Sequence, residues 1–403
     1  MMTICLVLLL SHQDDARIAG WIRDLGDDAI DVRERALTEL VRTGRRAEKA
    51  LRDAIRTSIG EVRGRAAQVL AEIEKGERLR QFEPGPSRIT LKTKDASLRT
   101  VLEELQKQTA TKIVSSSVPE DAKVTVAFEQ LPLFAAVDAL CRASGAVGWA
   151  VECRRDDAVT VTVSEGKFAD APRLIQDQYV LRLEAMHLAT TYDLQGGDAS
   201  KTRLDFRWGW EKGTRPQMAV LRIEELVDDL GNDYASEIAE DGRGRPYGFA
   251  YVQTQQAVEF AKVPPDGATK FARIKGSLDL SFPESMLVFP FEKPEDSAGA
   301  VLKREGGTIK LLTCSRDKTR LRAKIEVSPP DLGGRLEMKA VDKEAREFGG
   351  RYTRGEQGTD ESMVMWVEFT LPAQAQLTTL RFQSPSGYRE RKMPFELKDV
   401  RFR

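Results

Sequence analysis

The sequence predicts a multidomain protein with an N-terminal α-helical repeat, a central α+β module of the split βαβ type, and C-terminal all-β sandwiches. Three observations predict it. The chain has 403 residues, 41% of them hydrophobic and 31% charged, which is too long for one ordinary core and too apolar for disorder. Apolar residues recur with a helical period up to about residue 80. Strands and helices then alternate to residue 165, and strand-like alternation dominates afterwards.

The residue composition argues against several classes of function. Lys and Arg number 62 and Asp and Glu number 63, and the two signs are interleaved along the chain. Nucleic-acid binding needs a basic stripe, and the sequence shows none. With only two histidines, His12 and His187, His-based metal sites and catalytic triads are nearly ruled out. The four cysteines form no CxxC pair, so we expect no zinc site and no cofactor.

Residues 1–13 are interpreted as a signal peptide. An apolar run from Ile4 to Leu10 resembles the hydrophobic region of a secretory signal. No Lys or Arg precedes this run and it is short, so a fortuitously apolar start is the alternative. The run is also too short to span a bilayer. We therefore expect export to the periplasm or cell envelope, with no membrane span.

Residues 14–80 read as helical. The motif DVRERA at 31–36 recurs as EVRGRA at 61–66, each followed by a leucine four positions on, and Gly44 separates two helices as a helix C-cap would. An acidic residue, Val-Arg and then Arg-Ala at the start of a helix resembles the HEAT-type repeat. The match covers about one and a half repeats, which favours a helical cap or spacer. Residues 81–87 contain Pro-Gly-Pro and read as a linker.

Residues 88–165 show the clearest organisation in the chain. The order is strand, helix, strand, strand, helix, strand and a last strand. The two helices share a pattern of apolar positions, and such internal doubling is typical of a split βαβ unit. The apolar positions that echo each other are Leu98 and Leu133, Leu102 and Val137, and Leu105 and Leu140.

This segment resembles a known family. The run ITLKTKDASLRTVLEELQKQTATKIVSSSVPEDAKVTVAFEQLPLFAAVDALCRASG is similar to the secretin and TonB short N-terminal domain. A helix of the type xxLxxVLxxLxxQTG and a later VxVxFxxxPLxxAVDxLxxxSG-like strand and helix carry the resemblance. Ala110 stands where the family usually has glycine. The resemblance covers about a fifth of the chain and implies a docking or signalling module of the cell envelope without an active site.

Beyond residue 174 the pattern predicts two tandem immunoglobulin-like sandwiches, over 174–293 and 299–403. Short strands alternate with turn-rich separators, and each set is about the size of one sandwich. One large irregular β domain is the alternative. The expected strands are 179–183, 204–210, 220–227, 249–252, 257–260, 271–280, 286–291, 308–313, 321–327, 336–342, 363–371, 377–382 and 395–402.

An acidic turn is a weak candidate for a metal site. Asp228, Asp229 and Asp233 place carboxylates around Gly231, so Ca²⁺ is conceivable there. The spacing does not match the EF-hand loop, and acidic residues are more often simple turn formers. We therefore favour a turn over a metal site.

Tryptophans give a second candidate, a platform that stacks against sugars. Trp208 and Trp210 are the main candidates, with Trp149 and Trp366 as further members. Phe206, Trp208 and Trp210 share one face of a single expected strand, a pattern typical of a sandwich core. The sequence therefore favours a core position over a ligand platform.

Cysteines give a third candidate feature, a disulfide between Cys141 and Cys153. Both residues point inward in the expected module, one from a helix and one from a strand. In an exported protein they are able to pair, and such a bridge is typically worth a few kcal/mol. Two buried free thiols are an equal alternative, because the module's apolar pattern needs no covalent link.

These observations lead to three hypotheses of function. The leading one is a non-catalytic scaffold of the bacterial envelope that docks a protein partner through residues 88–165. A carbohydrate- or peptidoglycan-binding protein using the β region is the alternative, and an atypical β-sandwich hydrolase is the third. The sequence contains no GxSxG, GxxxxGK[ST], HExxH or GxGxxG motif, so we expect no enzyme.

Overall fold

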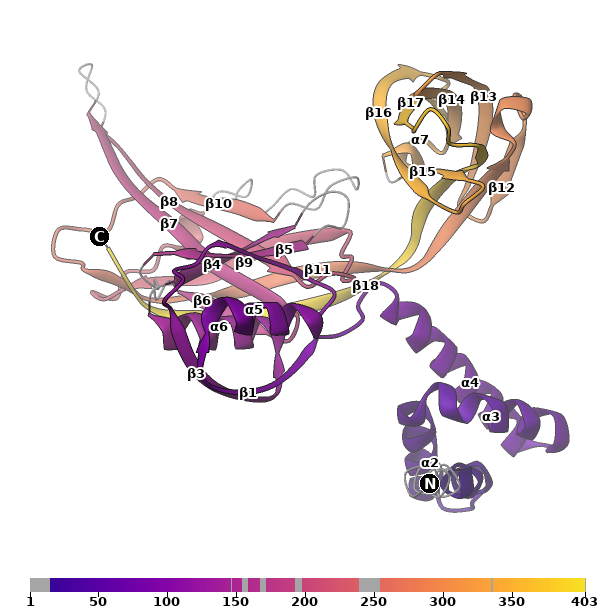
Figure 1. The fold of residues 1–403 in the computed structure, drawn as a ribbon, viewed down its shortest axis with the longest axis horizontal. Coiled ribbons are helices and arrows are strands. Elements are labelled where there is room, and N and C mark those ends of the chain that lie inside the picture. Colours follow the sequence, from indigo (N-terminus) through magenta and orange to yellow (C-terminus); the bar gives the residue numbers. More distant parts are fainter. Residues whose placement is uncertain are drawn as a thin grey trace. The chain divides into compact units, whose positions relative to one another are not determined.

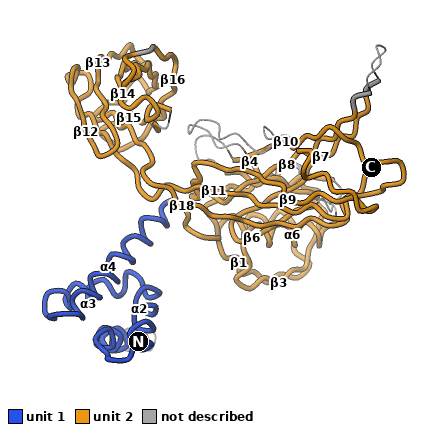
Figure 2. The backbone as a smooth tube through the Cα atoms, turned by 180° about the vertical axis from the view of Figure 1, so that it is seen from behind, with its two compact units in different colours: residues 1–81 blue, residues 82–403 orange. Residues whose placement is uncertain are grey.

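The computed structural model describes residues 15–145, 147–153, 159–166, 172–192, 198–238, 254–334 and 336–402. The chain divides into two compact units, residues 1–81 and 82–403 (Figure 2). The expected signal peptide and the expected strand 249–252 lie outside the described residues. None of the helices that are described is both long and apolar enough to cross a membrane.

The first unit is helical, as expected. A helix over residues 15–24 precedes α2 (Ile30–Thr43), α3 (Arg45–Thr57) and α4 (Glu61–Arg80). The two copies of the repeated motif open α2 and α4, and Ala36 and Ala66 are buried at equivalent places. Gly44 ends α2 with a φ of 62°, a conformation that glycine adopts without strain. Its backbone N–H donates to Leu40, which closes the last turn of α2.

The expected order of elements is present in the module of residues 88–165 (Figure 1). These elements form two small sheets, however, and not the single sheet of a split βαβ unit. One sheet pairs β1 with β3 antiparallel, and the other has the order β2-β5-β4, with β2 and β5 parallel. The bounds are β1 Arg88–Ser97, α5 Leu98–Lys107, β2 Lys112–Ser117, β3 Lys123–Pro132, α6 Leu133–Ser144, β4 Val147–Cys153 and β5 Val159–Glu165.

The apolar surface of α6 explains the two sheets. Its buried residues span an arc of about 160° at 3.6 residues per turn, wide enough to pack against strands on two sides. Each helix contacts a strand of both sheets, which places α5 and α6 between them. The buried residues of α6 are Leu133, Phe134, Ala136, Val137, Leu140 and Cys141.

The rest of the second unit is almost entirely strand. A four-stranded sheet has the order β10-β8-β7-β6, and a nine-stranded sheet has the order β12-β13-β14-β17-β16-β15-β18-β11-β9. The first-half bounds are β6 Arg173–Gln176, β7 Tyr179–Tyr192, β8 Asp198–Trp210, β9 Met218–Asp228, η1 Ala235–Glu237, β10 Gln255–Phe260 and β11 Lys270–Glu292. The second-half bounds are η3 Pro294–Asp296, β12 Val301–Arg304, β13 Gly307–Asp317, β14 Arg320–Ser328, α7 Pro330–Gly333, β15 Glu337–Asp342, β16 Glu347–Gln357, β17 Met363–Thr370 and β18 Leu377–Arg401.

Two long strands change the expected division into tandem sandwiches. β11 and β18, which the prediction places in different sandwiches, pair antiparallel from Lys270 opposite Arg401 to Glu292 opposite Thr379. The expected strands 271–280 and 286–291 are one strand, and so are 377–382 and 395–402. β9 and β11, before residues 293–299, therefore share one continuous sheet with the strands after these residues, and the chain returns along β18 to the region it left along β11.

Prolines explain why these long strands read as shorter ones. Pro283 lies inside β11, and Pro385 and Pro394 lie inside β18, where proline normally indicates a strand end. Each lies outside the segment in which its strand has a second neighbour. β9 pairs with β11 only up to Ser281, and β15 pairs with β18 only up to Gln383. A proline that faces an open edge costs no ladder hydrogen bond.

The second unit holds two separate hydrophobic cores. The first core joins the module to the proximal β region, and it includes Phe134 of α6, Trp208 of β8 and Phe395 of β18. The second core runs from Phe289 to Phe382 and fills what we call the second lobe, residues 287–382. β16 pairs first with β15 and then with β17, so the sheet bends at this strand around the second core.

Candidate functional site

Two glutamines at the C-terminal end of α5 bond to the backbone at one edge of each small sheet in the module. The amide of Gln108 pairs with the backbone of Thr90 in β1: the Thr90 N–H donates to Oε1 at 3.0 Å and Nε2 donates to the Thr90 carbonyl at 3.2 Å. Gln106 accepts the Ile113 N–H of β2 at 2.8 Å. Each glutamine thus takes the place that a neighbouring strand would fill.

The edge of β4 is also covered. Arg182 of β7 donates to the Trp149 carbonyl at 2.5 Å, and its guanidinium lies 5.7 Å from the centre of the Trp149 ring. The indole N–H of Trp149 donates to Asp138 at 3.0 Å, and Arg173 pairs with the same carboxylate at 2.8 Å. Burial lowers the pKa of Arg182, although the nearby Glu184 opposes this shift.

β3 is also an edge strand, with β1 as its one strand neighbour in the described part of the chain, and it differs in having no side chain bonded to its outer backbone groups there. Its side chains alternate between the core, where Val124 and Val126 are buried, and water, where Thr125 and Ala127 are exposed. No backbone hydrogen bond outside the β1 ladder is found for residues 123–129 within the described ranges. β3 is therefore the open edge of the module.

The expected linker is held firmly against the β region. Phe82 is buried in the first core, and its carbonyl accepts the Arg215 N–H at 2.7 Å. Glu83 is enclosed, its side chain 6% exposed, and it forms ion pairs with Arg389 and Arg391 of β18. We call residues 82–87 the anchoring segment.

Two carboxylates, Glu83 in the anchoring segment and Glu211 that contacts it, have opposite pKa shifts. Burial alone would raise the pKa of Glu83, but hydrogen bonds from Tyr179 (2.6 Å) and Arg389 and the charge of Arg391 hold it below its ordinary value. Glu211 is buried and forms no ion pair within the described ranges; burial raises its pKa, against the smaller opposing effects of the Ser87 hydrogen bond and the charge of Arg88. Its Oε2 accepts the Ser87 N–H at 2.9 Å, while its buried Oε1 has no hydrogen-bond partner.

The acidic turn forms a network of hydrogen bonds. Asp228 is buried and accepts the N–H groups of Leu230 and Asn232, both at 2.9 Å, and the Tyr234 hydroxyl at 2.7 Å. Burial would raise its pKa, but the donated hydrogen bonds lower it.

The other two aspartates of this turn also accept hydrogen bonds from nearby residues. Asp229 accepts the N–H and hydroxyl of Thr269, and Asp233 accepts the Ala235 N–H at 2.9 Å. These contacts are those of a turn, the alternative that the sequence favours. Within the described ranges, no three His, Cys, Asp or Glu residues are grouped to hold a metal ion.

The tryptophans proposed as a sugar platform lie in the first core. Trp208 is 2% exposed and Trp210 is 8% exposed, so neither ring offers a face to a ligand. Phe206, on the same face of β8 as the two tryptophans, lies 6.1 Å from the Phe395 ring of β18, whereas Gly209 on the opposite face leaves room for Val151 of β4. The two rings are therefore core residues, the alternative that their shared face favours.

The two cysteines of the module are unpaired thiols. Cys141 is buried in α6, while the Cys153 thiol points to the Trp210 carbonyl at 3.8 Å. Burial raises the pKa of Cys141 to about 12 and that of Cys153 to about 11. Both thiols are protonated at neutral pH, and the structure has the free-thiol alternative.

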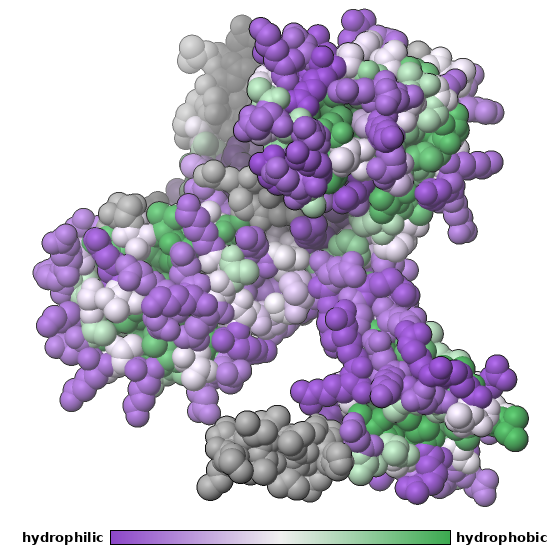
Figure 3. Space-filling view, turned by 45° about the vertical axis from the view of Figure 1, so that its right-hand side comes forward, coloured by the Kyte–Doolittle hydropathy of each residue, from purple (hydrophilic) through white to green (hydrophobic). Residues whose placement is uncertain are grey.

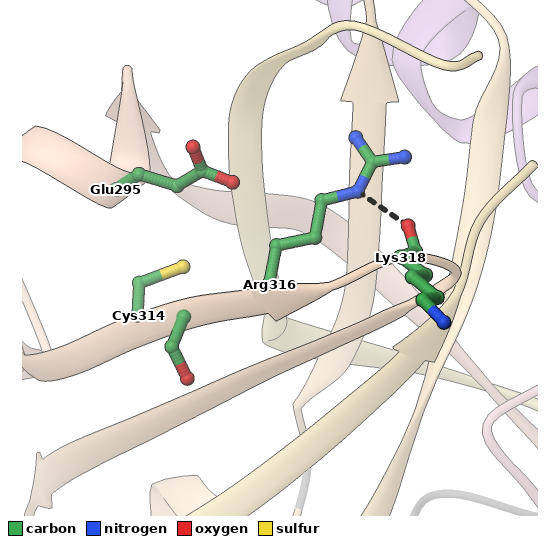
Figure 4. Close-up of a pocket in the computed structure, with 5 residues that line it drawn as sticks. Glu295, Cys314, Arg316 and Lys318 are labelled. Carbon is green, nitrogen blue, oxygen red and sulfur yellow. Dashed lines mark hydrogen bonds between the residues drawn. The ribbon is translucent and has the colours of Figure 1, made fainter. Parts of the chain in front are cut away.

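An open hollow of about 440 Å³ lies on the second lobe, lined by Glu295, Cys314, Ser315, Arg316 and Lys318 (Figure 4). Arg316 donates to the carbonyls of Ala375 (2.5 Å) and Pro372 (2.9 Å), so its guanidinium fastens the loop before β18. Burial raises the pKa of Cys314 to about 12, which keeps this thiol protonated. The hollow therefore offers neither an ionised thiol nor a free guanidinium.

No family model and no curated protein matches the chain. One solved structure, "the conserved domain protein from Bacillus anthracis", aligns with it at 8% identity and a TM-score of 0.18. The alignment covers 56% of this chain and 89% of that chain. A score this low carries no argument about fold or function.

The sequence analysis missed the residues that close the sheet edges and anchor residues 82–87. Gln108 belongs to the helix motif that carries the family resemblance, so its position was visible but its role as an edge cap was not. Glu83 follows a helix and precedes Pro-Gly-Pro, a context that reads as solvent-exposed linker. Its partners Arg389 and Arg391 lie about 300 residues away, at separations of 306 and 308. No local pattern reports such a contact.

Proposed function

We propose that the chain is a non-catalytic interaction protein of the bacterial cell envelope, and that it docks a protein partner through the module of residues 88–165. One observation carries the proposal: side chains bond to backbone groups of Thr90 in β1, Ile113 in β2 and Trp149 in β4, whereas in the described ranges no such bond reaches the backbone of residues 123–129 in β3. An open edge presents a row of backbone donors and acceptors, to which an extended segment of another protein adds as a strand.

The side chains of the two paired strands support the choice of β3. The exposed positions of β1 include Arg88, Lys92 and Lys94, and charged residues on an edge strand discourage pairing. The central exposed positions of β3, Thr125 and Ala127, are small and uncharged. A partner strand therefore meets fewer charges at β3 than at β1.

Site-specific crosslinking tests the docking surface. A photoreactive residue is placed at Ala127 on β3 or at Glu103, which is exposed on α5, and the full chain is irradiated in envelope extracts. We expect one discrete protein adduct from position 127 and none from position 103, identified by mass spectrometry. Adducts from position 103 alone would move the docking surface to the helix, and no adduct from either position would contradict docking by the module.

The envelope location rests on the apolar run at residues 4–10 and on the family resemblance. Fusing residues 1–40 to an alkaline phosphatase that is active only after export tests it in a bacterial host. A run with its leucines changed to glutamine is the matched control. We expect phosphatase activity from the first fusion only; equal activity from both, or activity from neither, would contradict export.

A further inference from the structure

The outer face of the second lobe carries one tryptophan among charged residues. Along β14 and β17 the side chains alternate, and Ala323, Met365 and Val367 point into the second core. Trp366 lies between the last two in sequence and therefore points outward. It is partly exposed, unlike Trp208 and Trp210.

Strand register places cations on both sides of this ring. Trp366 is opposite Lys324 of β14 and opposite Arg354 of β16. The Lys324 ammonium lies 5.1 Å from the centre of the ring, and the indole N–H donates to Glu356 at 3.2 Å. The Thr353 hydroxyl donates to the Trp366 carbonyl at 3.1 Å and fixes the neighbouring bulge.

Two residues further along β17, Glu368 lies between two arginines of the neighbouring strands. Glu368 is opposite Arg322 on one side and Arg351 on the other, with ion pairs of 3.1 and 2.5 Å. Its side chain is only 8% exposed, whereas those of Arg351 and Arg354 are 73% and 74% exposed. The guanidinium groups thus project into water around a carboxylate that stays close to the sheet.

The face as a whole is cationic. On β14, β17 and residues 350–357 of β16, five outward cations stand against three outward carboxylates, an excess of two positive charges. We call it the Trp366 face. Its aromatic and charged residues are Trp366, the cations Arg320, Arg322, Lys324, Arg351 and Arg354, and the carboxylates Glu326, Glu356 and Glu368.

We propose that the Trp366 face binds an anionic glycan, a chain of sugars that carries carboxylate groups. An indole ring packs against the C–H face of a sugar, and a planar guanidinium binds a carboxylate through two parallel hydrogen bonds. Glu356 lies at the edge of the ring, where a carboxylate accepts hydrogen bonds from sugar hydroxyls.

The interleaved carboxylates distinguish this ligand from a nucleic acid. Single-stranded nucleic acids also stack on aromatic rings in basic grooves, but they carry a phosphate at every nucleotide. Glu356 and Glu368 would repel these phosphates and the carboxylates of an acidic glycan alike, so the distinction rests on hydroxyl groups and not on charge. A glycan brings hydroxyl donors to the same two carboxylates. This inference uses a different lobe from the docking proposal and is independent of it.

Binding of an oligogalacturonate to the full chain tests the inference by calorimetry. We expect binding that weakens with added salt, and about tenfold or greater loss of affinity in Trp366→Ala, the loss that about 1.4 kcal/mol of ring contact would give. Arg354→Gln should also weaken binding, and since its side chain is exposed this variant keeps the fold. Trp21→Phe is the matched control, because Trp21 is also partly exposed beneath a cation, Arg17.

Three competing probes make the result decisive. The methyl-esterified oligomer has the same sugars without carboxylates and should bind more weakly than the acid. An oligothymidylate and a poly-glutamate peptide should bind more weakly still. The inference is overturned if either of these binds more tightly than the oligogalacturonate, if the uronate does not bind, or if its binding is unchanged in both Trp366→Ala and Arg354→Gln.

Discussion

The module of residues 88–165 and the second lobe differ in how they are held and in what they present. The module shares one continuous hydrophobic core with the proximal β region, whereas the second lobe has a core of its own. The module presents a row of backbone groups at the edge of β3. The second lobe presents side chains on the outer face of β14, β17 and β16.

The two regions therefore suit different kinds of ligand. An open strand edge recognises the backbone of an extended protein segment, with little demand on its sequence. A face with an aromatic ring and fixed charges recognises a ligand by its charges and hydroxyls. Both regions are connected through β11 and β18, which pass through both cores.

Alanine substitutions in the two cores should cause the largest losses of stability, and they test whether the cores unfold separately. Phe134→Ala removes a fully buried ring that stacks on Trp149 at 5.9 Å, and should lower the free energy of unfolding by about 3–5 kcal/mol. Phe369→Ala is the matched change in the second core. Calorimetry of the full chain should show each variant shifting a different transition. Equal shifts of one shared transition would contradict two separate cores.

Breaking the ion pairs of the anchoring segment should have the next largest effect. Glu83→Gln leaves Arg389 and Arg391 without their buried partner and should cost about 2–3 kcal/mol at neutral pH. Because the folded state lowers the pKa of Glu83, its contribution is present above the ordinary carboxyl range and is lost as pH falls through the folded pKa.

Urea unfolding of Glu83→Gln at several pH values checks this prediction. The difference in unfolding free energy between the variant and the unmodified chain should be largest near neutral pH and should shrink in acid. Asp177→Asn is the control, since Asp177 pairs with the same Arg391 at 3.1 Å but its side chain is 43% exposed, so its loss should be smaller. A gap that stays constant with pH would argue against the ion pairs.

Glu211→Gln should raise the free energy of unfolding, opposite to Glu83→Gln, and by a smaller amount. Its folded pKa is raised by burial, so the stability it contributes is present below the ordinary carboxyl pKa and lost as pH rises through the folded pKa. Glutamine keeps the acceptor for the Ser87 N–H and removes the buried charge. We expect a gain of about 1 kcal/mol at neutral pH that vanishes in acid, measured by the same urea series. A loss at neutral pH would contradict this account.

The smallest effect concerns the cap on β1. Gln108→Ala removes both hydrogen bonds to the Thr90 backbone and should cost about 1 kcal/mol. The Thr90 amide should then exchange with solvent faster, as read by nuclear magnetic resonance. Gln106→Ala is the control, because it should accelerate the Ile113 amide and leave that of Thr90 unchanged. An unchanged Thr90 rate in Gln108→Ala would show that the cap is not needed.

Local pattern predicted the helices and the order of elements in the module well. The stripe of Leu98, Val101, Leu102 and Leu105 is buried as its spacing requires. The division into two sheets did not follow from the same pattern. Periodicity reports which face of an element is buried, and it does not report which strands pair.

The long strands and several site residues also could not be predicted from local sequence, because they depend on pairing between distant segments. Pro283 and Pro394 read as strand ends because the sequence does not show that they face open edges. The acidic turn at Asp228 follows from turn chemistry, and the burial of Trp208 follows from its shared face with Phe206. Glu83 and the register partners of Trp366 depend on contacts between distant segments, so only the folded structure shows them.

Amide exchange in the full unmodified chain tests whether β3 is an open edge of the module. The account predicts slow exchange for the amides of Thr90 and Ile113, which are capped by glutamines. Between Val124 and Phe128 it predicts alternation, with amides paired to β1 protected and the intervening ones exchanging nearly as fast as in an open chain. Uniform protection along β3, or an unprotected Thr90, would contradict it.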